Sequence, residues 1–322
     1  MSREQRARVD AMMRQPHPQE PGTIEEIRAG FDALMARFPV PAGIRSTPAT
    51  LAGRPALRVE PGDAGPGSGT EQNSGTILYF HGGSWISGSP VTALALTAHL
   101  VVRTGLRAYS LDYRLAPEHP FPAAIEDTLA AYRTLLDSGA DPSSIAFAGD
   151  SAGGGLAVTT SLAARDAGLP MPAALLTFSA GLDATRTGAS MESKEGIDPI
   201  FTRASFAHTG PMYLAGADPR QPLLSPAVLG DLTGLPPILL QVGANEILLD
   251  DSTRLAARAR DAGVDVILDV TADVPHVFQA FAGDLDEADE ALDRAALFLG
   301  QRVRAHGDSV ALTSDVNRYE VE

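Results

Sequence analysis

The sequence predicts an α/β fold, in which helices flank both faces of a mostly parallel sheet. Three observations support this prediction. From about residue 76 onward, short apolar runs alternate with stretches of helical spacing, as in parallel sheets whose strands are joined by helices. A serine between glycines stands where one such strand meets the next helix. The rest of the 322-residue chain shows neither internal repeats nor the pattern of a second core.

The predicted strands are short, apolar and bounded by turn-forming residues. They cover residues 76–80, 106–111, 144–148, 173–178, 237–242 and 264–270. The predicted helices cover residues 91–103, 121–137, 151–166, 250–262 and 286–304. Right-handed crossovers bring the loops that follow parallel strands to one edge of the sheet, where α/β proteins bind their ligands. We therefore expect the functional residues in those loops.

Three segments do not fit this alternation. Residues 1–38 resemble two amphipathic helices, the second at 24–38. Residues 62–75 are rich in glycine and polar residues, which predicts a hairpin tip. Residues 184–222 contain a polar stretch followed by a helical pattern at about 202–215. We interpret the first and third segments as a cap over the sheet; the alternative is that residues 1–38 only pack against the outside.

This interpretation gives one core, interrupted once, and a cap in two parts. The segments are N-terminal cap helices at 1–45, a first part of the core at 46–183, a cap insertion at 184–222, a second part of the core at 223–305 and a C-terminal tail at 306–322. The tail is polar, and chain ends of this kind are commonly frayed.

The composition excludes some classes of protein. Hydrophobic residues make up 44% of the chain and charged residues 20%, which is enough apolar material for a large core. The formal net charge of −15 argues against a nucleic-acid partner, because such binding depends on Lys and Arg that neutralise phosphates. The same charge repels anions at long range, so a neutral small-molecule substrate is favoured.

The chain has no cysteine, which excludes disulfides, thiol nucleophiles and Cys-based zinc sites. The first residues mix charges of both signs where a signal peptide has an apolar core. No apolar run reaches the ~18 residues of a membrane-spanning helix. We therefore expect no membrane span and a cytoplasmic protein.

The candidate nucleophile is Ser151, in the sequence Gly149-Asp-Ser-Ala-Gly153. It lies between a predicted strand and a predicted helix, a placement that projects a serine hydroxyl above the sheet. Such a turn is strained, so small residues must flank it, and the helix directs its positive N-terminal end at a developing anion. The alternative is a glycine-rich turn without a nucleophile. The pentapeptide alone is a weak signal, and its placement is what favours catalysis.

A second glycine-rich turn, His81-Gly-Gly-Ser-Trp85, follows the first strong strand. Acyl transfer passes through an oxyanion that fixed backbone N–H groups must hold, and glycine lets the main chain approach it closely. We assign oxyanion donors to the N–H groups of Gly82, Gly83 and Ala152; a generic turn is the alternative. His81 is expected to order this loop and not to act as the base.

Three motifs together carry a family resemblance. The sequences HGGSW at 81–85, DYRLAPEHPFPAA at 112–124 and GDSAGG at 149–154 resemble those of the hormone-sensitive-lipase-like family of bacterial esterases. The likeness runs from roughly residue 75 to residue 300. It implies an α/β-hydrolase core with an N-terminal cap, no metal or other cofactor, and hydrolysis of small to medium esters. The stretch LQVGANEILLDD at 240–251 looks most similar to monoterpene ε-lactone hydrolases, which adds lactones to the candidate substrates.

The order of catalytic residues in this fold is serine, then acid, then histidine. Of the seven histidines, only His208, His276 and His306 follow Ser151. His208 falls in the expected cap and His306 at the end of the last predicted helix. His276 follows the strand at 264–270 on a short loop, so we assign it as the base; a surface histidine is the alternative.

The acid is expected in the loop after strand 237–242, which offers Glu246, Asp250 and Asp251. Its carboxylate must accept the second imidazole N–H and stabilise the imidazolium. Many family members have Asp-Pro-Leu-Arg-Asp here, with the first Asp catalytic. Aligning Asp250 with the last residue of that pattern places the acid at Glu246. Asp250 remains the alternative, although Asp250 and Asp251 are better explained as acidic residues at a helix start.

The candidate substrate-binding residues are apolar side chains near the expected cap and loops. They are Trp85, Phe206, Met212, Tyr213, Val277 and Phe278, with Leu214 beside them. A place in the core is an equal alternative for each of them. Asp183 follows a predicted strand, and we expect a structural hydrogen-bonding role for it.

Other functions and assemblies stay open at this point. An amidase, or a deacetylase of a specialised metabolite, would use the same three residues. Gibberellin receptors resemble these esterases but lack the catalytic histidine, so His276 argues against a receptor. A homodimer through an edge strand or the last helix is a further possibility, and the fold alone does not choose between these functions.

Overall fold

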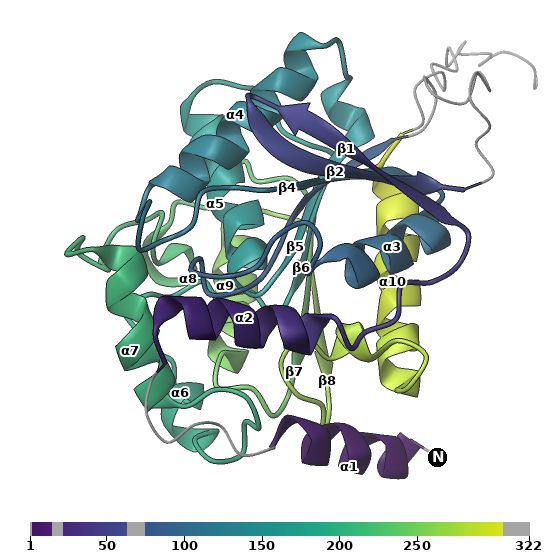
Figure 1. Ribbon diagram of the computed structural model, residues 1–322. Helices are drawn as coiled ribbons and strands as arrows, with labels where there is room; N and C mark the ends of the chain where they lie inside the picture. Colours follow the sequence, from purple (N-terminus) through teal and green to yellow (C-terminus); the bar gives the residue numbers. More distant parts are fainter. Residues whose placement is uncertain (1, 15–21, 63–74, 305–322) are drawn as a thin grey trace, which may run out of the picture.

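One eight-stranded sheet forms the centre of the protein (Figure 1). The computed structural model describes residues 2–14, 22–62 and 75–304, and its strands lie in the order β1-β2-β4-β3-β5-β6-β7-β8. The strands are β1 Ile44–Leu51, β2 Arg54–Pro61, β3 Thr76–Phe80, β4 Arg107–Leu111, β5 Ile145–Asp150, β6 Ala174–Phe178, β7 Ile238–Gly243 and β8 Val266–Thr271. All six predicted strands are present, with ends shifted by a few residues.

The sheet is mostly parallel, as predicted. Strands β3 to β8 pair in parallel, and within the described residues only β2 runs against its neighbours. Strands β3, β5, β6 and β7 are buried along their whole length, which explains their continuous apolar sequences. The loops after these strands therefore meet at one edge of the sheet.

Helices cover both faces of the sheet (Figure 1). On one face, α3 (Leu94–Thr104) packs against α10 (Asp286–Arg302). On the other face lie α4 (Ala123–Asp137), α5 (Ala152–Asp166) and α9 (Leu249–Asp261). Each face has its own cluster of buried side chains, so the sheet separates two apolar cores. None of the helices in the described ranges has the length and apolar character needed to cross a membrane.

The hairpin of β1 and β2 was not predicted from the sequence. Both strands contain prolines and charged residues, and most of their side chains are only partly buried. They turn at Ala52 and Gly53, which both have positive φ, as the tight turns that suit a hairpin's twist require. The prediction of a hairpin tip at 62–75 is wrong. The strands before and after this segment, β2 and β3, do not pair with each other, because β4 lies between them. Residues 63–74 themselves lie outside the described residues, as does the tail at 306–322.

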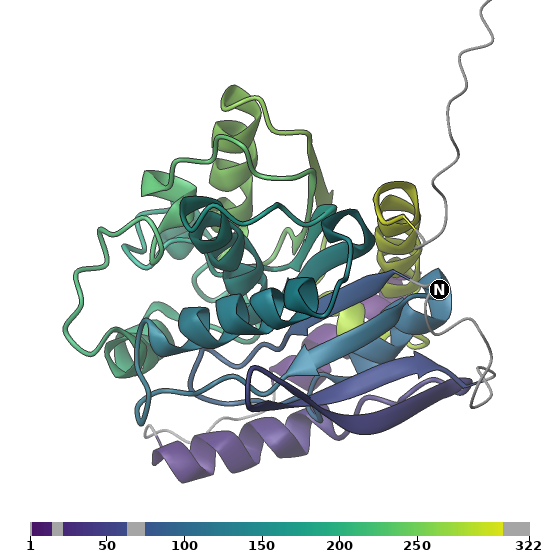
Figure 2. The same ribbon diagram turned by 90° about the horizontal axis from the view of Figure 1, so that it is seen from above.

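The N-terminal helix α2 (Ile24–Met35) lies across the carboxyl-end side of the sheet (Figures 1 and 2). A capping box between Thr23 and Glu26 begins this helix, satisfying backbone N–H groups that have no intrahelical partner. Its Arg28 donates to the carbonyl oxygens of Ile86 (2.8 Å) and Ala116 (3.1 Å). Arg28 also pairs with Glu118 at 2.6 Å. One side chain thus holds α2 against both the HGGSW loop and the DYRLAPEH loop.

Helix α1 (Ser2–Met13) packs beside the loop that follows β8. Its Val9 and Met13 are buried in one apolar cluster with Val274 and Phe278. Arg6 adds ion pairs to Asp273 and Glu287, both at 3.3 Å. These contacts bring α1 to a loop that carries one of the expected catalytic residues.

The segment 184–222 lies on the same side as α2 (Figure 1). It contains the short helix α6 (Ser190–Ser193) and the longer α7 (Arg203–Leu214), the latter close to the predicted 202–215. Helix α8 (Pro226–Leu229) follows it and returns the chain to β7, while the short turns η2 (Pro142–Ser144) and η3 (Phe278–Phe281) precede β5 and α10. Helices α2, α6 and α7 thus surround the edge where the loops after β3, β5, β7 and β8 converge.

Candidate active site

Ser151 occupies a strained turn between β5 and α5. Its backbone has φ 52° and ψ −118°, a region that residues other than glycine rarely adopt. Neighbouring loops hold this conformation: the Ser151 N–H donates to the Phe178 carbonyl at 2.8 Å, and its own carbonyl accepts from Gly181 N at 3.1 Å. The serine thus sits at the carboxyl end of β5, at the start of a helix.

The two glycines that flank this turn are required by space. A Cβ on Gly149 would lie 2.4 Å from the Gly153 carbonyl oxygen, and one on Gly153 would lie 1.9 Å from the Phe80 carbonyl oxygen. Both distances are far below a van der Waals contact. The turn can therefore pack against the end of β3 only if both positions are glycine, which brings Ser151 next to the HGGSW loop.

His81 orders the HGGSW loop, as the sequence predicted. Its Nδ1 donates to the Gly82 carbonyl at 2.8 Å, and its ring stacks on Tyr113 with centroids 4.1 Å apart. The Tyr113 hydroxyl in turn donates to the His81 carbonyl at 2.7 Å. Burial lowers the pKa of His81 to about 4, because low-dielectric surroundings disfavour the imidazolium. Tyr113 thus connects the 112–124 motif with the HGGSW motif in the fold.

The assignment of Gly82 as an oxyanion donor is corrected by the structure. Its N–H donates to Asp150 Oδ1 at 3.0 Å, an atom that also accepts from the Tyr79 hydroxyl at 2.8 Å. A bonded N–H is not free to bind a substrate oxygen. The N–H groups of Gly83 and Ala152 donate to no acceptor among the described residues, and neither does that of Ser84. The sequence shows a Gly-Gly turn but not which of its N–H groups an internal carboxylate occupies.

Glu246 and His276 form a buried pair. His276 Nδ1 lies 2.8 Å from Glu246 Oε2, and both side chains are buried. Glu246 Oε1 accepts from Ser179 Oγ at 2.6 Å and from Gly243 N at 2.5 Å. His276 Nε2 is buried and has no hydrogen-bond partner among the described residues. The carboxylate therefore orients the imidazole and leaves its second nitrogen available.

Ser179 is a site residue that the sequence analysis missed. It is fully buried after the end of β6, with φ 50°. Its hydroxyl donates to Glu246 and accepts from Val277 N at 2.9 Å. Ser179 therefore ties the acid loop to the histidine loop. A serine directly after a mostly apolar strand was the available signal.

Asp250 and Asp251 lie in the first turn of α9 and are bonded to segments other than the His276 loop. Asp250 Oδ2 accepts from Ser190 N at 2.9 Å and so holds α6. Asp251 Oδ2 accepts from the backbone N–H groups of Leu182 (2.7 Å) and Asp183 (3.0 Å). Their carboxylates bind segments of the chain other than the histidine loop, so the geometry favours Glu246 as the partner of His276.

Burial would lower the pKa of His276, but the surrounding carboxylates outweigh it and raise the pKa above its ordinary value of 6.5. These carboxylates are Glu246, Asp198 and Asp150. Asp198 comes from the segment 184–222, where it accepts from Ile247 N at 2.8 Å. Asp150 directly precedes Ser151 in the chain and is the third carboxylate that raises this pKa.

Some of the predicted lining residues meet at one cavity. Trp85 stacks on Tyr213 with ring centroids 4.5 Å apart, and these two residues, with Phe206, line a cavity of about 160 Å³. Leu214 lines it as well. Met212 packs in the apolar cluster beneath Tyr213, and Val277 packs on the core next to α3.

Phe278 does not line this cavity, and its prediction as a substrate-binding residue is corrected. The turn η3 directs its ring into the cluster under α1, where it is fully buried. Asp183 has the structural role expected for it, since it accepts from Thr187 Oγ1 at 3.0 Å and pairs with Arg254 at 3.0 Å.

Comparison with known proteins gives the family. The family described as the α/β hydrolase fold matches residues 77–280. An acetyl-hydrolase of Streptomyces hygroscopicus is 44% identical over 228 residues, which are 71% of this chain and 76% of the relative. An esterase of Acinetobacter venetianus is 36% identical over 275 residues, 84% of this chain and 87% of the relative.

The solved structures agree with the sequence relatives. The structure of an esterase from the bacterial hormone-sensitive lipase family is 39% identical, has a TM-score of 0.87, and covers 93% of this chain and 98% of that chain. A hormone-sensitive lipase from a metagenome library is also 39% identical, with a TM-score of 0.86 and 94% and 98% coverage. The chain therefore belongs to the hormone-sensitive-lipase-like family of α/β-hydrolases. It is an enzyme of the hydrolase class, which confirms the predicted resemblance.

The pKa of His276 provides a test of this site. Replacing Asp198 by Asn removes one of the three carboxylates that raise this pKa, so the pKa should fall toward or below 6.5. NMR titration of the imidazole measures it in both proteins. Asp231→Asn, on the surface beside Thr233, is the matched control and should leave the titration unchanged. An unchanged or raised pKa in Asp198→Asn would contradict this electrostatic account.

Proposed function

We propose that the protein is a carboxylic ester hydrolase that acts through Ser151, His276 and Glu246. The observation that carries this proposal is the buried Glu246–His276 pair, whose Nε2 is left without a partner at the edge of the sheet where Ser151 lies. A carboxylate bonded to one imidazole nitrogen fixes the tautomer in which the other nitrogen can accept a proton. The esterases among the related proteins support the same reaction.

The proposed reaction proceeds through an acyl-enzyme. His276 Nε2 takes the proton of Ser151 as the serine oxygen attacks the ester carbonyl. The oxyanion is held by the free N–H groups of Gly83 and Ala152, with Ser84 as a further donor. His276 then protonates the leaving alcohol. Water repeats the sequence on the acyl-enzyme, with His276 again taking the proton, and releases the acid.

Only the neutral imidazole can accept the serine proton. Because the carboxylates raise the pKa of His276 above 6.5, we expect activity to be lost as the pH falls through that raised pKa. Glu246 stabilises the imidazolium that forms during attack, since it lies 2.8 Å from Nδ1 and is buried. In a site of low dielectric such a pairing is stronger than in water.

The substrates that we propose are small to medium esters, with lactones as a further group. A lactone carbonyl meets the same nucleophile, and its leaving alcohol stays joined to the acyl group through the ring carbons, so that water releases a single hydroxy acid. The cavity of about 160 Å³ suits short acyl or alkoxy groups. A panel of acyl chain lengths and lactones separates these classes.

A second candidate is removal of an acetyl group from a specialised metabolite, as an ester or an amide. The observation that favours it is the 44% identity to an acetyl-hydrolase. Comparing an acetyl ester with the matching N-acetyl amide distinguishes the two candidates. A non-catalytic receptor is disfavoured, because the oriented Glu246–His276 pair has no role in ligand binding alone.

We also propose a homodimer through the free edge of β8. This strand leaves Ile267 46% and Val270 45% exposed, and an edge strand offers unpaired backbone groups for pairing with a second copy. The last helix is the alternative interface, with Leu297 63% exposed.

Removing the nucleophile tests the proposed reaction. Ser151→Ala should lose nearly all turnover of a short-chain p-nitrophenyl ester, while an organophosphonate should label Ser151 of the unchanged protein and fail to label the variant. Mass spectrometry of the intact protein measures the label. Retained turnover in Ser151→Ala would overturn the assignment.

The identity of the acid is tested by two matched substitutions. Glu246→Gln removes the charge that stabilises the imidazolium, so kcat should fall by about 10³–10⁴-fold. Asp250→Asn acts on the bond to Ser190, away from the imidazole, and should change kcat far less. The reverse order of effects would assign the acid to Asp250.

The dimer is tested by light scattering after gel filtration. The unchanged protein should elute as a dimer, and Ile267→Lys combined with Val270→Lys should give a monomer, because buried lysine charges oppose strand pairing. Leu297→Lys is the comparison variant. A monomeric unchanged protein would contradict the proposal, and dissociation only in Leu297→Lys would place the interface on α10.

A further inference from the structure

One charged side chain lines a cavity whose other walls are mostly apolar. Ser84 and Trp85 of the HGGSW loop line this cavity, as does Gly155, whose N–H donates to the Ser151 carbonyl at 3.1 Å. Among the residues that line it, Arg186 alone carries a permanent charge. A cation at the wall of an apolar cavity is unfavourable unless it has partners.

The guanidinium of Arg186 makes no hydrogen bond to the described residues. Its Nη1 is buried without a hydrogen-bond partner and forms an ion pair with Asp251 Oδ2 at 3.7 Å, a distance too long for a hydrogen bond. Its Cζ lies 4.1 Å from the centroid of the Phe206 ring, so the cation is stacked on an aromatic face. A guanidinium has five N–H donors, and no hydrogen bond from any of them reaches the part of the chain that the structure describes.

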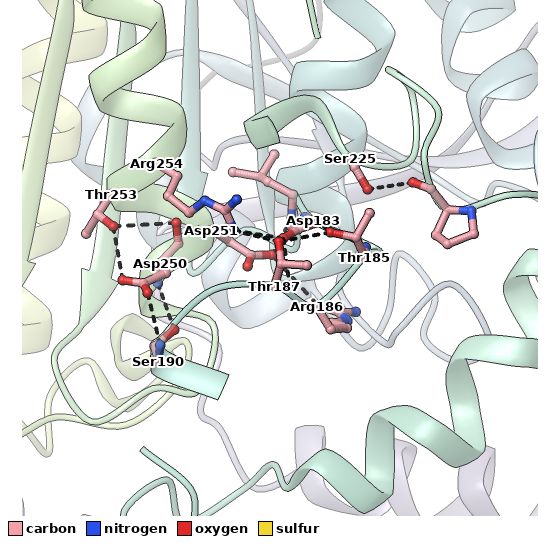
Figure 3. Close-up of polar contacts among 12 residues, drawn as sticks. Asp183, Thr185, Arg186, Thr187, Ser190, Ser225, Asp250, Asp251, Thr253 and Arg254 are labelled. Atoms are coloured by element: carbon pink, nitrogen blue, oxygen red, sulfur yellow. Dashed lines mark hydrogen bonds and ion pairs between the residues drawn. The ribbon is translucent and has the colours of Figure 1, made fainter. Parts of the chain in front are cut away.

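The loop around Arg186 is built to hold it in place (Figure 3). Arg186 has φ 53°, a strained value that persists only when the surroundings impose it. Asp183 holds the backbone on both sides of Arg186, since its carboxylate accepts from the N–H groups of Thr185 (2.9 Å) and Thr187 (3.2 Å). Arg254 then pairs with Asp183 at 3.0 Å. Arg254 is therefore used to fix the loop.

The two arginines differ in what they bind. Arg254 donates to Asp183 and to Thr187 Oγ1, each at 3.0 Å, whereas Arg186 lies beside this cluster and meets it only through the longer ion pair with Asp251 (Figure 3). Asp251 balances part of the Arg186 charge, but it is already bonded to two backbone N–H groups. The free donors of Arg186 remain available to a molecule in the cavity.

A chain of ring contacts connects Arg186 with the catalytic histidine. Phe206, under the guanidinium, stacks on Phe201 with centroids 5.0 Å apart, and Phe201 packs edge-on against His276 at 4.8 Å. Arg186 thus lines a cavity that borders the HGGSW loop, and two stacked rings connect it with His276.

We propose that Arg186 is a specificity residue that binds a carboxylate or similar anionic group on the substrate, so that the enzyme acts on esters that carry such a group beside the scissile bond. This inference rests on the proposed ester hydrolase function. The anionic substrate proposed here differs from the neutral one that the net charge of −15 favours. A fixed donor in contact with the anion outweighs a long-range repulsion that salt screens.

The anionic group can belong to the acyl or to the alcohol part, and two pairs of probes distinguish them. The acyl pair is mono-p-nitrophenyl glutarate and the neutral p-nitrophenyl pentanoate. The alcohol pair is the butyrate ester of p-hydroxybenzoate and the neutral phenyl butyrate. For each pair, the ratio of kcat/KM for the anionic ester to that for the neutral ester is measured.

In one of the pairs, Arg186→Met should lower this ratio by about 10- to 100-fold relative to the unchanged protein, as loss of a hydrogen bond to a charged group does. Arg186→Lys, which keeps the charge but not the fork of donors, should lose less. Arg203→Met is the matched control: it removes an exposed cation at the start of α7 and should leave both ratios unchanged.

An unchanged ratio in both pairs for Arg186→Met would overturn the proposal. So would an equal loss for anionic and neutral esters, because it would mean that Arg186 only supports Phe206 and the fold. Turnover of the neutral esters shows that each variant is folded. If the unchanged protein hydrolyses none of the four esters, the proposed ester hydrolase function fails instead, and the two failures are distinguishable.

Discussion

The rest of the site depends on the burial of one carboxylate, that of Glu246. A buried charge needs partners, and Glu246 finds them on three segments: Gly243 at the end of β7, Ser179 after β6 and His276 after β8. Because these contacts use both oxygens, the three loops cannot shift independently. Glu246 therefore positions His276 and also locks together the edge of the sheet on which Ser151 stands.

Helix α2 and the segment 184–222, which we interpret as a cap, are attached to that edge by the same means: charged side chains bonded to backbone groups of another segment. Arg28 of α2 holds the carbonyl oxygens of two loops. Asp198 accepts from the N–H that follows Glu246, and Asp250 holds the start of α6. Such bonds satisfy polar groups that loops would otherwise bury without a partner. They also make the position of the cap, and with it the shape of the cavity, depend on the loops of the core.

The elements that could be predicted were those whose sequence reflects burial directly. Strands β3, β5, β6 and β7 are continuous apolar runs because both of their faces are covered. The hairpin of β1 and β2 was missed because its residues are partly exposed and its sequence contains prolines, so neither an apolar run nor a clean alternation appears. Gly82 was misassigned because the availability of an N–H depends on a carboxylate 68 residues away in the chain.

The sequence by itself determined the α/β core, its order of strands and helices, and the residue types at the nucleophile turn, since steric limits and local spacing leave few alternatives there. It also narrowed the acid to three carboxylates. Only the tertiary structure shows which of them is bonded to His276, because Glu246, Asp250 and Asp251 differ in the partner of each carboxylate and not in the type of group. The same holds for the two arginines: Arg254 is paired and Arg186 is left with free donors. Partners of this kind come from distant segments, and local sequence does not show which of them meet.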